Sequence, residues 1–233
     1  MSNEKVIIDA FGINKKEVIS IVGAGGKTSL MFHLADNLIG RKIVTTTTKI
    51  MKPEKYNVEF GQITFKTDNQ IIVTAKTQEG PKLIGYNQTV DKSQYDYLLI
   101  EADGSRMLPL KGWGQFEPVI YDLTTKTIGV IDITTIGLDI SATKIFRLNE
   151  LAKITLLEEN ININNLVDIV NSRNGLFKES IGQRILYINK VESEVDSLNA
   201  KELIKILNES KQSYKIDRVV IGSIFNNYFE VIK

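Results

Sequence analysis

The residues best suited to chemistry lie in one glycine-rich segment near the start of the chain. It reads Gly23-Ala24-Gly25-Gly26-Lys27-Thr28-Ser29. Glycines let a backbone approach a phosphate closely, and the N–H groups at a helix start add positive potential. Lys27 supplies a full charge for the terminal phosphates, and the Thr28 hydroxyl suits Mg²⁺. The segment therefore predicts binding of nucleotide phosphates together with magnesium.

The spacing within this segment separates it from related motifs. The long Walker A pattern, G-x-x-x-x-G-K-[ST], fails because its first glycine would fall on Ile21. A shorter form, Gly23-x-x-Gly26-Lys27-Thr28, fits and resembles the phosphate loop of Mur-type ligases. The dinucleotide pattern G-x-G-x-x-G fails at Thr28, so hydride transfer loses support. The competing structural interpretation is a glycine-rich turn with an incidental lysine.

Two carboxylates follow the apolar segment 97–100, in the order Glu101-Ala102-Asp103-Gly104. In a phosphate-loop fold, the carboxyl end of such a strand faces the metal and the terminal phosphate. Either Glu101 or Asp103 could therefore hold Mg²⁺, directly or through water, and the Gly104 N–H could contact the terminal phosphate. The competing interpretation is that one carboxylate only caps the loop or pairs with Arg106.

Polar residues also end two other apolar segments. Thr47, Thr48 and Lys49 end the run Thr45-Thr46-Thr47-Thr48-Lys49, and they would turn toward the same crevice, where hydroxyls can bind Mg²⁺ or a phosphate. β-Branched threonines equally suit an ordinary strand. Later, Asn189-Lys190-Val191-Glu192 resembles the N-K-x-D segment with which GTPases bind guanine, with Glu192 one methylene longer than aspartate. A solvated turn is the alternative there.

The loop from Gly104 to Pro118 combines glycine, proline, cations and the single tryptophan of the chain. Arg106 and Lys111 could bind an anion there, and a long loop after a catalytic strand is more often functional than not. The alternative is that Trp113 and Phe116 anchor the loop in the core while Arg106 and Lys111 are solvated.

Composition narrows the class of protein. The chain has 233 residues, no cysteine, and 29 basic against 28 acidic residues. Absence of cysteine excludes disulfides and thiolate chemistry, and the balanced charge gives no general attraction to nucleic acid or to anionic membranes. No apolar run approaches the roughly 18 residues that span a bilayer, and the N-terminus does not resemble a signal peptide. We therefore expect a cytoplasmic protein, and the sequence leaves its oligomeric state open.

Strands and helices alternate along the chain, which favours a mostly parallel sheet flanked by helices. We expect strands at 18–22, 43–47, 97–101, 127–132, 184–188 and 218–221. We expect helices at 28–39, 149–158, 163–170 and from Asp196 or Ser197 onward. Short β segments at 62–67, 70–74 and 82–86 add a β-rich insertion. The prediction is a three-layer α/β fold like that of P-loop NTPases, a single domain over 1–233 with insertions at about 56–90 and 141–180.

Together these segments resemble one family, the selenium-dependent hydroxylase accessory proteins, or YqeC family. The resemblance covers nearly the whole chain, and its most specific part is Glu101-Ala102-Asp103-Gly104-Ser105-Arg106-x-x-Pro109-Leu110-Lys111. More distantly, the phosphate loop with Glu101-x-x-Gly104 and Asn189-Lys190 looks like the nickel-insertion GTPases of urease and hydrogenase maturation. The resemblance implies a nucleotide-dependent step in the maturation of molybdenum-containing hydroxylases.

The residues and the resemblance together predict a Mg²⁺-dependent NTPase, with GTP favoured over ATP, that assists a client hydroxylase or its cofactor. The expected catalytic residues are Lys27, Glu101, Asp103 and Arg106, and the expected metal ligands are Thr28, Glu101 and Asp103. The other expected nucleotide contacts are Gly23 to Ser29, Thr47, Thr48, Lys49, Gly104, Lys111, Asn189, Lys190 and Glu192. Two alternatives stay open: an ATP-dependent ligase or kinase with a Mur-like loop, and a nucleotide-gated chaperone that does not hydrolyse.

Overall fold

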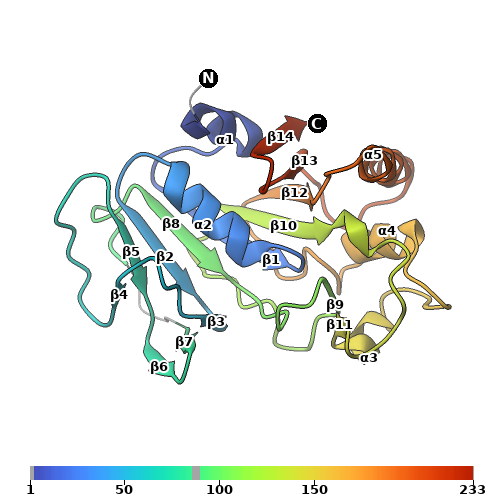
Figure 1. The fold of residues 1–233 in the computed structure, drawn as a ribbon, viewed down its shortest axis with the longest axis horizontal. Coiled ribbons are helices and arrows are strands. Elements are labelled where there is room, and N and C mark those ends of the chain that lie inside the picture. Colours follow the sequence, from blue (N-terminus) through green and yellow to red (C-terminus); the bar gives the residue numbers. More distant parts are fainter. Residues whose placement is uncertain (1–2, 86–89, 233) are drawn as a thin grey trace.

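The computed structural model describes residues 3–85 and 90–232. Its centre is a nine-stranded sheet in which every neighbouring pair is parallel except β13 and β14 (Figure 1). From one edge to the other the strands are β14 (Tyr228–Val231), β13 (Arg218–Ser223), β12 (Gln183–Asn189), β10 (Lys126–Asp132), β1 (Glu17–Gly23), β8 (Tyr97–Glu101), β2 (Lys42–Thr46), β5 (Ile71–Thr74) and β4 (Val58–Glu59).

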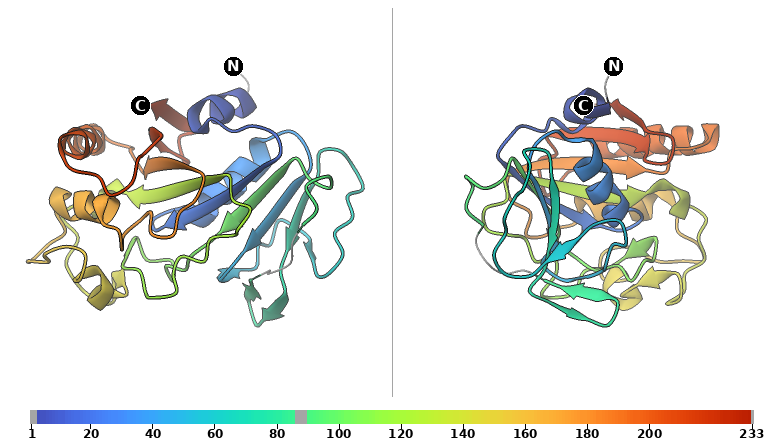
Figure 2. Two further views of the ribbon diagram at one scale, coloured as in Figure 1. Left: turned by 180° about the vertical axis from the view of Figure 1, so that it is seen from behind. Right: turned by 60° about the vertical axis from the view of Figure 1, so that its left-hand side comes forward.

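Helices cover both faces of this sheet. α1 (Asn3–Phe11) and α2 (Lys27–Asn37) pack on one face, and α4 (Ile163–Asn171) and α5 (Glu194–Glu209) pack on the other (Figures 1 and 2). The middle strands β2, β8 and β10 are buried along their whole length. Opposite α2, loop residues such as Ile63 and Tyr121 cover β2 and β8, whereas α4 and α5 cover the β10 to β13 side of that face. The predicted three-layer α/β fold with a mostly parallel sheet is confirmed.

The order of the strands places a crevice at the middle of the sheet. From β1 the chain runs outward to β2, whereas from β10 it runs the other way to β12. The carboxyl ends of β1 and β10 therefore flank a topological switch point, the usual ligand site of open α/β sheets. The glycine-rich segment follows β1 directly and enters α2 at Lys27.

Two small sheets extend beyond the carboxyl ends of the central strands. β3 (Lys49–Met51), β7 (Lys82–Ile84) and β6 (Thr77–Glu79) form one of them. β9 (Leu110–Lys111) pairs with β11 (Ile145–Phe146) in the other, next to the short helix α3 (Leu148–Leu151). Figure 1 shows them at the lower left and lower right, on either side of the centre.

Several expected elements have different limits in the structure. Segment 62–67 forms no strand, and the strand expected at 82–86 ends at Ile84, with Tyr86 outside the described residues. The helix expected over 149–158 is only α3, after which the chain turns and leaves Leu156 exposed. α5 begins earlier than expected, because Ser193 caps it and Asp196 closes the capping box from the third position.

The two ends of the chain form elements that the sequence patterns did not predict. α1 buries Ile7 and Phe11 against the sheet, although its β-branched run is not typical of a helix. β14 is an exposed edge strand, held by antiparallel pairing with β13. Phe229 on β14 contacts Phe11 and Tyr187, so tertiary packing decides both elements.

Candidate functional site

The loop after β1 adopts a conformation that its glycines alone permit. Gly23, Gly25 and Gly26 all have positive φ, at 101°, 78° and 132°. A Cβ on Gly25 would lie 2.2 Å from Cβ of Asp132, and one on Gly26 would lie 2.3 Å from Nδ2 of Asn189. Because Gly26 has no side chain, no side chain caps the first N–H groups of α2. These groups are therefore suited to bind an anion.

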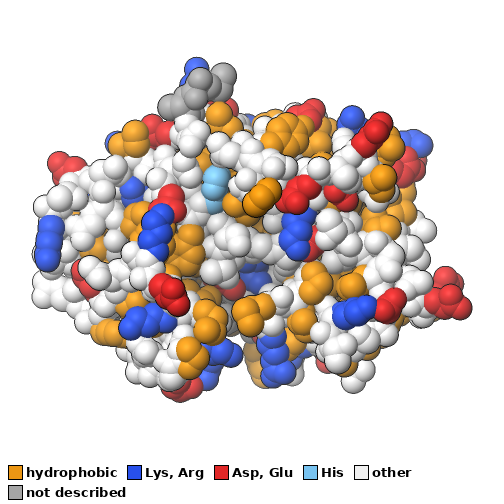
Figure 3. All heavy atoms as spheres, in the orientation of Figure 1, with side chains coloured by type: hydrophobic (Ala, Val, Ile, Leu, Met, Phe, Trp, Pro, Cys, Tyr) orange, Lys and Arg blue, Asp and Glu red, His pale blue; other side chains and the backbone are white. Residues whose placement is uncertain are grey.

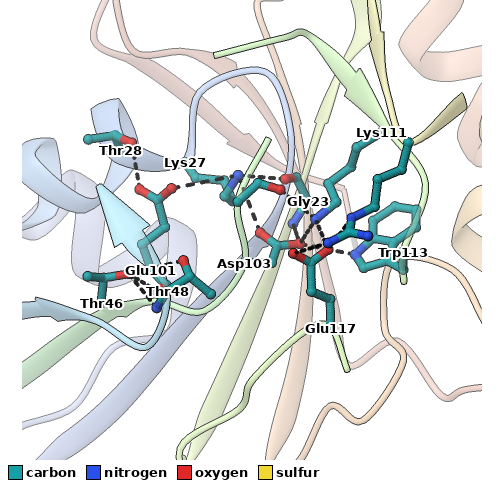
Figure 4. A network of polar contacts seen from close by, with 12 residues as sticks. Gly23, Lys27, Thr28, Thr46, Thr48, Glu101, Asp103, Lys111, Trp113 and Glu117 are labelled. Carbon is teal, nitrogen blue, oxygen red and sulfur yellow. Dashed lines mark hydrogen bonds and ion pairs between the residues drawn. The ribbon is translucent and has the colours of Figure 1, made fainter. Parts of the chain in front are cut away.

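Lys27 folds back into this loop. Its side chain is 3% exposed, and Nζ donates to the Gly23 carbonyl at 2.7 Å. The same nitrogen lies 3.3 Å from Oδ1 of Asp103 and 3.8 Å from Oε1 of Glu101 (Figure 4). The ammonium group therefore stands between the two carboxylates that follow β8, inside the turn expected to hold phosphate.

Glu101 joins Lys27 to the start of α2. Its Oε2 accepts a hydrogen bond from the Thr28 hydroxyl at 2.5 Å. Burial raises the pKa of the Glu101 carboxyl above its ordinary value, and Lys27 and Thr28 offset this effect only in part. The negative charge of Glu101 is thus only partly balanced, and a hydroxyl oxygen lies beside it. Oxygen ligands of this kind suit a hard cation such as Mg²⁺.

Asp103 has more donors around it than Glu101, but they meet only one of its oxygens, since the buried Oδ1 accepts no hydrogen bond and lies 3.3 Å from Lys27 Nζ. Its Oδ2 accepts hydrogen bonds from the Gly23 N–H, Lys111 Nζ and Trp113 Nε1, each at 3.0 Å. Burial alone would raise the pKa of Asp103, but the charges of Lys111 and Lys27 and the Gly23 N–H hold it below its ordinary value. Asp103 therefore anchors the loop to the residues around it.

Lys111 lies on the side of Asp103 away from Lys27. Its fully buried Nζ also donates to the Gly104 carbonyl at 2.7 Å and to Oε2 of Glu117 at 3.3 Å. The Glu117 carboxylate in turn accepts a hydrogen bond from Nη2 of Arg147 at 3.2 Å and forms an ion pair with its Nε at 3.1 Å. A continuous chain of alternating charges thus connects the glycine-rich loop to the sheet of β9 and β11.

The threonine turn after β2 contacts the same region. Thr46 Oγ1 donates to the Glu101 carbonyl at 2.9 Å and accepts from the Thr48 N–H at 3.0 Å (Figure 4). Thr47 Oγ1 instead donates to the Val119 carbonyl at 2.7 Å. Lys49 pairs with Glu79 on the small sheet at 2.8 Å, so it is not brought to Lys27. The turn therefore supports β8 chiefly through Thr46.

Asn189, Lys190 and Glu192 occupy the carboxyl end of β12, on the other side of the loop. Asn189 Nδ2 donates to the Gly25 carbonyl at 2.9 Å, and Lys190 Nζ pairs with Oδ2 of Asp132 at 2.5 Å. Glu192 Oε1 accepts from the Ser223 hydroxyl at 2.8 Å. This end of β12 is therefore linked to the glycine-rich loop, to β10 and to β13.

Asp132 and Ser223 are two polar residues of this region that the sequence analysis did not select. Both are the last residues of buried strands, Asp132 of β10 and Ser223 of β13. The rule that selected Glu101, a polar residue at the carboxyl end of an apolar strand, also applies to them. The loop residues Gly104 and Arg106 lie nearer the surface, and Phe116 is 81% exposed, so only Trp113 of the two aromatic residues is a core anchor.

The surface is hollowed between the two small sheets. Figure 3 shows this hollow at the lower centre, between the parts of the molecule that carry the two small sheets in Figure 1. Two cavities of about 460 Å³ each lie elsewhere, at the amino ends of the strands, one beside Lys42 and the other beside Arg218. Because ligands of open α/β sheets bind beyond the carboxyl ends, the hollow is the better candidate.

Two general properties of the described residues bear on the site. None of the helices in 3–85 and 90–232 has the length and apolar character needed to cross a membrane. The same residues contain no cluster of three or more histidine, aspartate or glutamate side chains that could hold a metal ion. A Mg²⁺ ion here would therefore need oxygens from a phosphate and from water, which is its usual mode of binding.

The fold and the loop define the class: an α/β protein whose parallel sheet carries a glycine-rich, lysine-containing turn after its central strand. The family described as YqeC protein matches residues 19–149, which include the loop and both carboxylates. The chain is 30% identical over 245 residues to the uncharacterised protein YqeC of Escherichia coli K12, covering 94% of this chain and 92% of that protein. The chain belongs to the YqeC family. No solved structure matches it.

Proposed function

We propose that this protein binds a nucleoside triphosphate with Mg²⁺ in the loop after β1 and hydrolyses it. The observation that carries the proposal is the arrangement of Lys27, Thr28 and Glu101 at the uncapped start of α2. It combines free helix N–H groups, a buried ammonium and a carboxylate–hydroxyl pair within one turn. Few other ligands need all three, whereas a magnesium–triphosphate complex does.

The residues present fit magnesium. Thr28 Oγ1 and the Glu101 carboxylate would hold the ion, directly or through water, because they converge at 2.5 Å and Glu101 lacks full compensation. Bound magnesium would neutralise charge on the terminal phosphate oxygens. Asp103 already accepts three hydrogen bonds on one oxygen and is fully buried, so we assign it to positioning.

Lys27 is the residue we expect to meet the phosphates. Its Nζ is held at the Gly23 carbonyl, so a small movement would bring it to an anion lying over the loop. There its charge would stabilise negative charge that accumulates on the transferred phosphate. Asp103 holds both Lys27 and the Gly23 N–H and would thereby keep the turn in its binding conformation.

We propose that the base is guanine. Support comes from Glu192, whose carboxylate could accept two hydrogen bonds from guanine N–H groups and is oriented by Ser223. Asn189 ties this end of β12 to the Gly25 carbonyl, and Lys190 lies at Asp132 beside the same loop. One ligand bound on the loop could therefore reach both regions.

The resemblance to hydroxylase accessory proteins supports a role for this NTPase in maturing a molybdenum-containing hydroxylase or its cofactor. Affinity purification of the tagged protein with a GTP analogue tests this role. Co-purification of a hydroxylase that depends on Lys27 would support it. A nucleotide-dependent partner of another class would contradict it.

Calorimetric titration with Mg-GTP and Mg-ATP tests the nucleotide proposal. We expect Lys27→Ala to weaken binding at least about 100-fold, because it removes the only full charge in the loop. Lys205→Ala, an exposed lysine on α5, is the matched control and should bind normally. Absence of nucleotide binding by the native protein would overturn the proposal, and equal affinity for GTP and ATP would overturn the choice of guanine.

Turnover measurements separate the modes of action. Phosphate release from GTP without any added acceptor is the expected result. Strict dependence on an acceptor would identify a kinase or ligase instead. Tight binding with no turnover would identify a nucleotide-gated chaperone.

A further inference from the structure

Arg106 is an exposed guanidinium without a carboxylate partner among the residues that the structure describes. It follows Gly104 on the loop after β8, close in sequence to both buried carboxylates. Its guanidinium carbon lies 5.1 Å from the centre of the Phe146 ring on β11. The side chain is therefore held on an aromatic surface, although no anion compensates its charge.

Other cations surround the same ring. Arg147 Cζ also lies 5.1 Å from the centre of Phe146, and Lys111 Nζ lies 5.8 Å from it. Lys111 and Arg147 are compensated by Asp103 and Glu117. Cations gathered around one ring repel one another, and their attraction to the ring is weak at a solvent-exposed site. An anion beside Arg106 would relieve that repulsion.

Lys178 adds to the excess of positive charge. Its Nζ donates to the backbone carbonyls of Gly114 and Gln115, at 2.8 and 3.0 Å, and within the described part of the chain it has no carboxylate partner. A Cβ on Gly114 would lie 2.8 Å from a terminal nitrogen of Arg147, so this lysine is anchored next to that arginine. The surface near β9 and β11 therefore carries the charges of Lys178 and Arg106 in addition to its ion-paired cations.

The backbone around the ring is strained. Arg106, Met107 and Arg147 have φ of 53°, 62° and 54°, in the left-handed region that residues with a Cβ rarely adopt. Such conformations are energetically unfavourable, and they concentrate at ligand sites. Two of the three strained residues are the arginines that flank Phe146. Two separate segments, the loop after β8 and the junction of β11 with α3, therefore hold these guanidinium groups in a disfavoured backbone conformation.

We infer that Arg106 binds the phosphate or carboxylate group of a second ligand, which the protein holds together with its nucleotide. That this ligand is a second one, bound beside a nucleotide, rests on the proposed function. Arg106 packs on Phe146, at the far end of a series of contacts that runs from Lys27 through the fully buried Asp103 and Lys111. Arg106 therefore serves an anion other than the phosphates on the loop.

The test uses inorganic phosphate as the probe, at constant ionic strength, on protein saturated with Mg²⁺ and a non-hydrolysable GTP analogue. The readout is the melting temperature. We expect a saturable rise for the native protein. Arg106→Met should weaken the apparent affinity about 10–100-fold, the loss expected for hydrogen bonds to a charged group. Arg173→Met, which removes another exposed arginine, is the matched control and should respond like the native protein.

Three outcomes would overturn the inference. The first is absence of a saturable rise in the native protein, and the second is an equal response in Arg106→Met. The third is an Arg106→Met protein that binds the triphosphate analogue more weakly but binds GDP normally, because Arg106 would then contact the nucleotide itself. If the native protein binds no nucleotide, the proposed function fails, and an Arg106-dependent rise with phosphate alone would still support the anion site.

Discussion

Glu101 is the last residue of β8, and Asp103 lies two residues further along the chain. Both are buried beside Lys27, yet their surroundings differ. Glu101 faces Thr28 and the threonine turn, where one hydroxyl and one shared ammonium compensate it. Asp103 faces Lys111 and Trp113 and accepts three hydrogen bonds. Burial raises the pKa of Glu101, whereas at Asp103 the charges of Lys111 and Lys27 and the Gly23 N–H together outweigh burial and lower the pKa.

This difference separates two uses of a buried carboxylate. A carboxylate surrounded by fixed donors is a structural anchor, because its charge is already compensated without a ligand. One that lacks compensation remains attractive to a cation that arrives later. The pair therefore divides the work at the end of β8 into a positioning residue and a metal-binding residue. Four measurements test whether the two carboxylates differ in this way.

The largest effect should come from Asp103→Ala. The substitution leaves Lys111 buried at 0% exposure without its closest carboxylate, and loss of one partner of a buried ion pair costs about 3–5 kcal/mol. Denaturant unfolding measures the change. Lys111→Met in the Asp103→Ala background should restore part of the loss. A cost below about 1 kcal/mol would show that Asp103 is not an anchor.

Trp113→Phe should have a smaller effect of the same kind. It removes the Nε1–H that donates to Asp103 at 3.0 Å while keeping an aromatic ring. A hydrogen bond to a charged group contributes about 1.5–3 kcal/mol, and the unfolding free energy should fall by that amount. Phe116→Leu, at an exposed position of the same loop, is the control and should leave stability unchanged.

The pH dependence of stability should differ in sign between the two carboxylates. Because the pKa of Glu101 is raised, the folded state holds its proton more tightly than the unfolded chain, so this contribution falls as pH rises above 4.5 through the folded pKa. The lowered pKa of Asp103 gives stability that is present above 3.8 and lost as pH falls through its folded pKa. The free energy of unfolding is measured against pH for the native protein and for Glu101→Gln. The difference between the two curves isolates the contribution of Glu101. A difference that rises with pH would contradict it.

Glu101→Gln should have the smallest effect on stability. An amide still accepts the Thr28 hydrogen bond and removes a charge that burial disfavours, so the unfolding free energy near neutral pH should be unchanged or raised. The affinity of the nucleotide complex for Mg²⁺ should fall about 10–100-fold, as when a metal site loses a supporting carboxylate. Asp103→Asn is the comparison. If it weakens Mg²⁺ as much as Glu101→Gln does, the division between the two residues is wrong.

The sequence by itself determined the central architecture. Apolar segments such as 18–22 and 97–101 are patterns of strands buried on both faces, and Gly23 to Thr28 is a local signal that needs only neighbouring residues. The core strands β1, β2, β8, β10, β12 and β13, the helix after the loop and the order of these motifs follow from such local patterns. Family membership could be inferred for the same reason, because the matching residues lie in short contiguous segments.

Tertiary structure decided what each polar residue does. The roles of Glu101 and Asp103 differ because the chain folds back after Asp103, so that Lys111 and Trp113 bond to Asp103 and not to Glu101. Lys49 pairs with Glu79 because β3, β6 and β7 form a sheet of their own. Contacts of this kind depend on which segments of the chain lie together in the folded protein. The residues next to a position in the sequence do not reveal this.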